Sequence, residues 1–133
     1  MAVEIIRQSS QGYSVKPFLI RADDSQTYFV KGVERAGRSA LVSEAISAEL
    51  GLLLKLPIPP WRVMEIPHEL IEISMLENVE DLRGGLAFAS LQVPNSADLL
   101  ISSVSNIPLE LQRLVLIFDW WVLNGDRALS ELG

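Results

Sequence analysis

Three side chains in this sequence have the types and the spacing for phosphate chemistry: Lys31, Glu44 and Asp126. Lys31 ends the β-prone segment Tyr28-Phe29-Val30-Lys31, and Glu44 follows thirteen positions later in a segment with helical periodicity. A lysine ammonium is a compact charge that can hold phosphate oxygens, and a nearby carboxylate can hold that lysine in place. Asp126, in Asn124-Gly125-Asp126-Arg127, could accept the proton of a hydroxyl group.

Each of these residues also has a plainer interpretation. A lysine at a strand end is by default a solvated charge. Glu44 could be a helix-surface acid, since acids are favoured near the positive N-terminus of a helix. Asp126 could belong to an ordinary turn, because Asn-Gly-Asp is turn chemistry. Their combined meaning therefore depends on the elements that position them.

The first third of the sequence predicts three strands, at Val3–Arg7, Val15–Arg21 and Thr27–Lys31, because β-formers alternate with turn clusters. The turn Ser9-Ser10-Gln11-Gly12 lies between the first two strands. A loop in this place could cover phosphates with its backbone N–H groups, although it is poor in glycine.

The middle of the sequence changes period. Arg38–Lys55 carries a wide apolar face at helical spacing, with Ser39 as the expected N-cap. Proline-rich residues 56–60 end this helix. Strands are then expected at Trp61–Ile66 and Leu86–Val93, with a helical turn at residues 68–72 and a solvated loop at residues 77–81 between them.

The last third predicts a linker and a helix. Residues 94–106 have linker composition, with a helical turn at 97–101. Pro108 is the expected first residue of a helix that runs to about Leu123. Trp120 and Trp121 are expected to pack in the core. The order of elements predicts one domain of the α+β class.

Composition excludes several kinds of protein. The net charge of −6 and the scattered basic residues argue against direct nucleic-acid binding. The absence of cysteine excludes disulfides and thiolate metal sites. With no signal peptide and no apolar run of membrane length, we expect a cytoplasmic protein without a membrane segment. The mean hydropathy of +0.28 is high for a small domain and predicts apolar surface for self-association or a protein partner.

Four segments, in this order, resemble the HipA-like kinases, in particular their compact branch. The segments are Tyr28–Gly32, Leu41–Pro60 with Glu44, Phe88–Ser90, and Phe118–Arg127. The resemblance implies an α+β fold with a protein-kinase-like N-lobe, an antiparallel sheet plus one main helix, followed by the first helix of a truncated C-lobe. The implied divisions are an N-lobe at 1–93, a linker at 94–107 and the start of a C-lobe at 108–133.

The resemblance also implies ATP-dependent phosphoryl transfer to a protein serine or threonine, with ATP and Mg²⁺ as cofactors. Lys31 and Glu44 would anchor the phosphates, and Asp126 would be the catalytic-loop base. The remaining implied nucleotide contacts are the turn residues Ser10 and Gly12 and the hinge-like segment Phe88, Ala89 and Ser90.

The sequence departs from the family after Asp126. The family places a metal-binding Asn and then a metal-binding Asp there, whereas only Arg127 to Gly133 follow here, without an Asn. We therefore expect no metal ligands in this chain and little or no activity from it alone, because phosphoryl transfer relies on Mg²⁺. The alternatives are a non-enzymatic interaction module on a half-kinase scaffold, or an unrelated α+β domain. A close Lys31–Glu44 pair would argue against the last.

Overall fold

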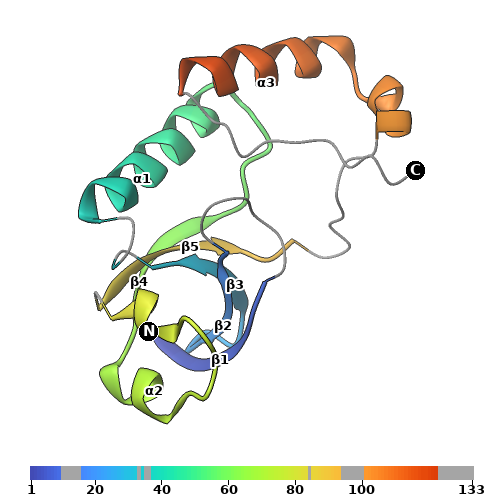
Figure 1. Ribbon diagram of the computed structural model, residues 1–133. Helices are drawn as coiled ribbons and strands as arrows, with labels where there is room; N and C mark the ends of the chain where they lie inside the picture. The colour runs from blue at the N-terminus through green and yellow to red at the C-terminus, as the bar shows by residue number, and fades with distance from the viewer. Residues whose placement is uncertain (10–15, 33, 35–36, 84, 94–100, 123–133) are drawn as a thin grey trace.

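An antiparallel sheet forms the centre of the molecule (Figure 1). The computed structural model describes residues 1–9, 16–32, 34, 37–83, 85–93 and 101–122. The five strands of the sheet are ordered β1-β2-β3-β5-β4. Their bounds are Ala2–Gln8 (β1), Phe18–Ala22 (β2), Thr27–Lys31 (β3), Trp61–Glu65 (β4) and Leu86–Leu91 (β5).

Helices lie on both sides of this sheet. The α-helices are Arg38–Leu53 (α1), His68–Ile73 (α2) and Leu109–Trp121 (α3), and the 3-10 segments are Val79–Leu82 (η1) and Ile101–Asn106 (η2). In Figure 1, α1 and α3 lie on one side of the sheet and α2 lies on the other. The α+β arrangement predicted from the sequence, a kinase-like N-lobe plus one helix, is confirmed.

The hydrophobic core lies between the sheet and the α2–η1 segment. Because successive strand side chains point to opposite faces, alternate residues of each strand enter this core. Those that do so include Phe18, Ile20, Val30, Met64 and Ala89, which meet Ile71 of α2 and Val79 and Leu82 of η1. The opposite face of the sheet therefore carries the other half of each strand, and it is the face that α1 approaches.

The N-cap of α1 lies two residues before the expected one. Gly37 is its N-cap, with a φ of 81°, and no side chain caps the helix, so the expected Ser39 cap is wrong. A φ in this region suits glycine, which lets the chain turn sharply into α1. Ser39 lies inside the first turn of the helix instead. The end of α1 is close to the prediction, at Leu53 rather than Lys55.

The solvated loop expected at residues 77–81 is also wrong. Val79–Leu82 forms η1, in which Val79, Asp81 and Leu82 are buried. The reason is packing: Val79 and Leu82, three residues apart, lie on the same side of a 3-10 turn and join the core. The acidic residues around them concealed this apolar pair.

The C-terminal helix turns its tryptophans outward. Trp120 and Trp121 are 81% and 63% exposed, so the expectation that they pack in the core is wrong. Phe118 is the buried residue of α3, and it lies against Gly51 of α1. Trp120 follows it by about 200° of helical rotation and so points away from α1. Pro108 is the N-cap of α3 rather than its first residue.

The segment before α3 is tied to it by one side chain. Gln112 Nε2 donates to the carbonyl oxygens of Val104 and Ile107 at 2.9 and 2.8 Å. The helical turn expected at residues 97–101 mostly lies outside the described residues, and the 3-10 segment observed here follows it, at Ile101–Asn106.

Candidate functional site

Lys31 and Glu44 form an ion pair between the sheet and α1. Lys31 Nζ lies 2.8 Å from Glu44 Oε1, and the two side chains are 37% and 39% exposed. Lys31 is the last residue of β3, and Glu44 lies in the second turn of α1. The expected proximity of the two groups is confirmed, which argues against an unrelated fold that would place them apart.

The geometry leaves Lys31 able to hold a further anion. An ammonium carries three N–H donors, of which the contact with Glu44 needs one. The Lys31 side chain as a whole is more than a third exposed, so solvent reaches this part of the molecule. The residues present therefore fit a role in holding nucleotide phosphate, with Glu44 fixing the position of the ammonium group.

The loop between β1 and β2 starts and ends at the same end of the sheet as Lys31. Gln8 pairs with Phe18, and Phe18 pairs with Val30, the neighbour of Lys31. Ser9 N donates to Pro17 O at 2.8 Å, which joins the two ends of this loop. The predicted phosphate contacts within it, Ser10 and Gly12, lie outside the described residues.

Phe88, Ala89 and Ser90 lie inside the sheet. They pair with residues 29–31 of β3 on one side and with residues 61–63 of β4 on the other. Phe88 is the direct partner of Lys31 and shares its face, whereas Ala89 points into the core. The adenine contact expected from this segment stays a prediction.

Asp126, the expected base, lies outside the described residues. Within the described part of the chain, no group of three His, Asp or Glu side chains could hold a metal ion. His68, the one histidine of the sequence, is exposed, with its Nε2 3.1 Å from Glu72 Oε1 on α2. We therefore assign no Mg²⁺ ligand among these described residues.

A second contact between α1 and the sheet was not foreseen from the sequence. Trp61 Nε1 donates to Glu49 Oε1 at 2.9 Å. The indole of Trp61 also stacks on the ring of Phe88, with centroids 5.5 Å apart and planes inclined by 20°. The sequence offered one indication of this contact. Trp61, whose indole N–H needs an acceptor, is the first residue of β4, the strand that follows α1.

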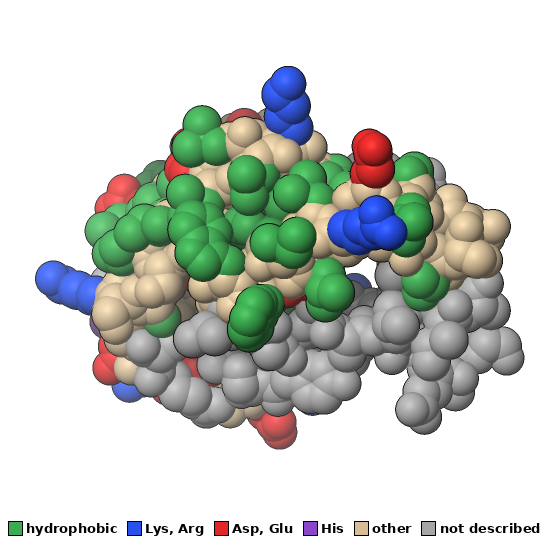
Figure 2. Space-filling view, turned by 90° about the horizontal axis from the view of Figure 1, so that it is seen from above, with side chains coloured by type: hydrophobic (Ala, Val, Ile, Leu, Met, Phe, Trp, Pro, Cys, Tyr) green, Lys and Arg blue, Asp and Glu red, His purple; other side chains and the backbone are tan. Residues whose placement is uncertain are grey.

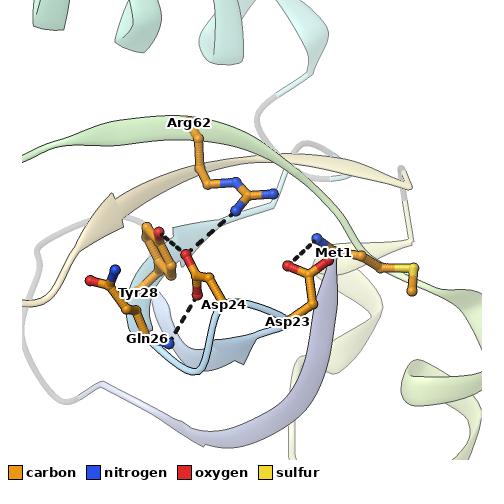
Figure 3. Close-up of polar contacts among 6 residues, drawn as sticks. All are labelled: Met1, Asp23, Asp24, Gln26, Tyr28 and Arg62. Carbon is orange, nitrogen blue, oxygen red and sulfur yellow. Dashed lines mark hydrogen bonds and ion pairs between the residues drawn. The ribbon is translucent and has the colours of Figure 1, made fainter.

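A separate polar cluster lies at the hairpin between β2 and β3 (Figure 3). Asp24 Oδ2 accepts a hydrogen bond from Tyr28 Oη at 2.7 Å and lies 3.7 Å from Arg62 Nη1. The hydrogen bond from Tyr28 is the main reason that the pKa of Asp24 is lowered, followed by one from Gln26 N. The same bond, together with burial, raises the pKa of Tyr28. Tyr28 belongs to the core face, opposite the Lys31 side of the sheet.

The helices that the structure describes include none with the length and apolar character needed to span a membrane.

Comparison with known proteins agrees with the geometry. The chain matches the family model described as HipA-like kinase over residues 2–133, essentially its whole length. No curated protein and no solved structure matches it. This match agrees with two features of the structure, the five-stranded sheet with α1 and the ion pair of Lys31 with Glu44. The chain belongs to the HipA-like kinase family.

Proposed function

We propose that this chain forms the nucleotide-binding lobe of a kinase that phosphorylates a protein serine or threonine. In this proposal Lys31 holds the phosphates of ATP and Glu44 holds Lys31. The observation that carries the proposal is the 2.8 Å contact between Lys31 Nζ and Glu44 Oε1. It lies at the end of the sheet where the β1–β2 loop begins and ends.

Transfer itself needs more than this lobe. In the family, Asp126 would accept the proton of the acceptor hydroxyl, and Mg²⁺ would neutralise charge on the phosphates. No Asn follows Asp126 in the sequence. We therefore propose that residues 1–133 bind nucleotide but transfer the phosphoryl group poorly, if at all, without further residues that supply the metal ligands.

Nucleotide binding is tested by titration calorimetry with ATP, ADP and adenosine. Replacing Lys31 by Met should weaken ATP and ADP binding about tenfold or more, because a charge-assisted hydrogen bond to phosphate is lost. Adenosine binding should hardly change, since it has no phosphate. The matched control is Lys55→Met, which removes the same charge from an exposed position two residues after the end of α1.

Two results would contradict the proposal. One is the absence of ATP binding to the unmodified chain. The other is an equal loss of ATP affinity in the Lys31 and Lys55 variants, which would mean that the loss comes from the change in net charge and not from a contact of Lys31. Phosphoryl transfer is then assayed with labelled ATP on the polypeptide that the whole reading frame encodes, with Lys31→Met as the inactive comparison.

A second candidate function is a non-enzymatic protein-binding module, which one surface favours. Large apolar side chains of α1 and α3 are exposed, including Val42, Ile46, Leu116 and Ile117. Figure 2 shows green side chains gathered on the face seen from above, where these helices lie in Figure 1. Exposed apolar patches of this kind commonly mark protein contacts. The partner would be a second copy or another protein.

This candidate is tested by measuring the molar mass across a concentration series by light scattering. Self-association through this face should give a mass that rises with concentration, and Ile117→Lys should reduce it. Arg113→Ala, a change of a charged residue on the same helix, is the control. A monomer at all concentrations, in both the unmodified and variant proteins, would count against self-association.

A further inference from the structure

A closed circuit of contacts joins α1 to three strands of the sheet. Lys31 of β3 pairs in register with Phe88 of β5, and Phe88 stacks on Trp61 of β4. Trp61 donates its indole N–H to Glu49 of α1. Five residues earlier on the same helix, Glu44 forms the ion pair with Lys31, which completes the ring of contacts. Each member is therefore placed by two neighbours.

Apolar packing alone holds α1 weakly. Only Ala48 and Gly51 of this helix are buried, and both are small. Val42 and Ile46 remain more than half exposed. Leu41 and Leu50 are only half-buried, so no large side chain of α1 is fully enclosed, and the close packing that normally resists rotation and axial shifts is limited. Polar contacts must supply much of the constraint.

Two polar contacts at different points along α1 fix its orientation better than one contact does. Glu44 and Glu49 are separated by about 7.5 Å along the helix axis. The contact of Glu44 ends on the flexible stem of a lysine, so by itself it limits the position of α1 only loosely. The contact at Glu49 ends instead on an indole that is held by its strand and by the ring of Phe88. It is the stiffer of the two.

We propose that Trp61 is a positioning residue for the phosphate anchor. Its N–H fixes Glu49, and thereby sets α1 so that Glu44 meets Lys31. The proposal rests on the function proposed above for the Lys31–Glu44 pair, and it assigns no contact between Trp61 and nucleotide. Because the contact is exposed, its loss should shift the helix without unfolding the protein.

The variants separate the hydrogen bond from the ring. Trp61→Phe keeps an aromatic ring on Phe88 and removes the donor. Glu49→Ala removes the acceptor, whereas Glu49→Gln keeps an acceptor oxygen and should behave like the unmodified protein. Trp120→Phe removes an indole that is 81% exposed on α3, and serves as the matched control.

The first readout is independent of nucleotide. The NMR signal of the Lys31 ammonium group, assigned by its absence in Lys31→Arg, reports the contact with Glu44. Glu44→Ala, which removes the acceptor, defines the signal of a broken pair. Trp61→Phe and Glu49→Ala should move the Lys31 signal toward that position, while Glu49→Gln and Trp120→Phe should leave it in place. The second readout is the Kd for ATP, which should rise about threefold to tenfold in the two disrupting variants, the range set by one hydrogen bond.

The outcomes are distinguishable. The proposal is overturned if Trp61→Phe and Glu49→Ala leave the Lys31 signal unmoved, or if Glu44→Ala itself fails to move it. It is also overturned if Glu49→Gln disrupts as much as Glu49→Ala. If the signal moves as expected but the unmodified protein binds no ATP, the result supports the positioning role of Trp61 and contradicts the proposed nucleotide binding.

Discussion

The α-carbon of Gly32 lies so close to the backbone carbonyl of Asp81 that no β-carbon fits between them. The same carbonyl accepts a hydrogen bond from Glu34 N at 3.2 Å. Through this contact the residue after Lys31 is held against η1, at the point where β3 ends. The position of the lysine therefore depends on a glycine that carries no functional group.

Replacing Gly32 by Ala should destabilise the fold by roughly 1 to 3 kcal/mol, the usual cost of forcing extra volume into a packed site. The obstacle is backbone, which cannot rotate away. The free energy of unfolding, measured by urea denaturation, checks this. Gly51→Ala is the control: a β-carbon there would meet side-chain rather than backbone atoms, Cγ1 and Cδ1 of Ile58 at 2.9 Å and Cζ of Phe118 at 3.5 Å. Its crowding is offset by the helix propensity of alanine, about 1 kcal/mol. An equal loss in both variants would contradict the argument.

Removing the ion pair should affect nucleotide binding far more than folding. Lys31 and Glu44 are both more than a third exposed, and pairs of this kind contribute at most about 1 kcal/mol to stability. The free energies of unfolding of Lys31→Met and Glu44→Gln, measured by urea denaturation, should therefore lie within about 1 kcal/mol of that of the unmodified protein. A much larger loss would mean that the pair is structural rather than functional.

The Asp24 cluster predicts a specific response to acid. Its pKa in the folded protein lies below the ordinary value of 3.8, so the stability that it contributes is fully present above pH 3.8. That contribution is lost as the pH falls from 3.8 through the folded pKa. Tyr28→Phe should raise the pKa of Asp24, because it removes the largest cause of the shift.

This response is measured by NMR titration of the Asp24 carboxyl carbon. Arg62→Met, which removes only a weaker Coulombic contribution, should raise the pKa of Asp24 less than Tyr28→Phe does. The reverse order would contradict the assignment. On the alkaline side, the raised pKa of Tyr28 contributes stability below pH 10.0, which is lost as the pH rises through the folded pKa.

Two neighbours on α3 should differ sharply in their contribution to stability. Phe118 is 5% exposed and lies against Gly51, whereas Ile117 is 64% exposed. Phe118→Ala should lower the free energy of unfolding by about 3 to 5 kcal/mol, the typical cost of truncating a buried phenylalanine. Ile117→Ala should change it by less than about 0.5 kcal/mol. Similar losses at both positions, measured by denaturation, would mean that α3 packs differently.

Local pattern was enough to predict much of the fold. The segment Thr27–Lys31 was predicted with its observed bounds, because it is rich in β-forming residues. The proximity of Lys31 and Glu44 was expected from a resemblance in the order of motifs, and it is confirmed. The first success rests on a short stretch of the sequence, and the second on the order of motifs along the chain.

The errors concern contacts between distant segments. Local periodicity identifies Trp120 as apolar but does not say which side of α3 has a partner. The burial of Val79 and Leu82 depends on η1 reaching the sheet. The bond from Trp61 to Glu49 depends on how β4 aligns with β5, which no spacing in the sequence specifies.

The sparse burial of α1 has a consequence for hydrogen exchange. Only Ala48 and Gly51 are buried in this helix, and polar contacts at Glu44 and Glu49 join it to the sheet. Such a helix can detach as a cooperative unit at a free energy well below that of global unfolding. Its amides should therefore exchange earlier than those of β3 and β5, which pair on both sides. Removing the N–H of Trp61 should speed exchange in α1 and leave the strands unchanged.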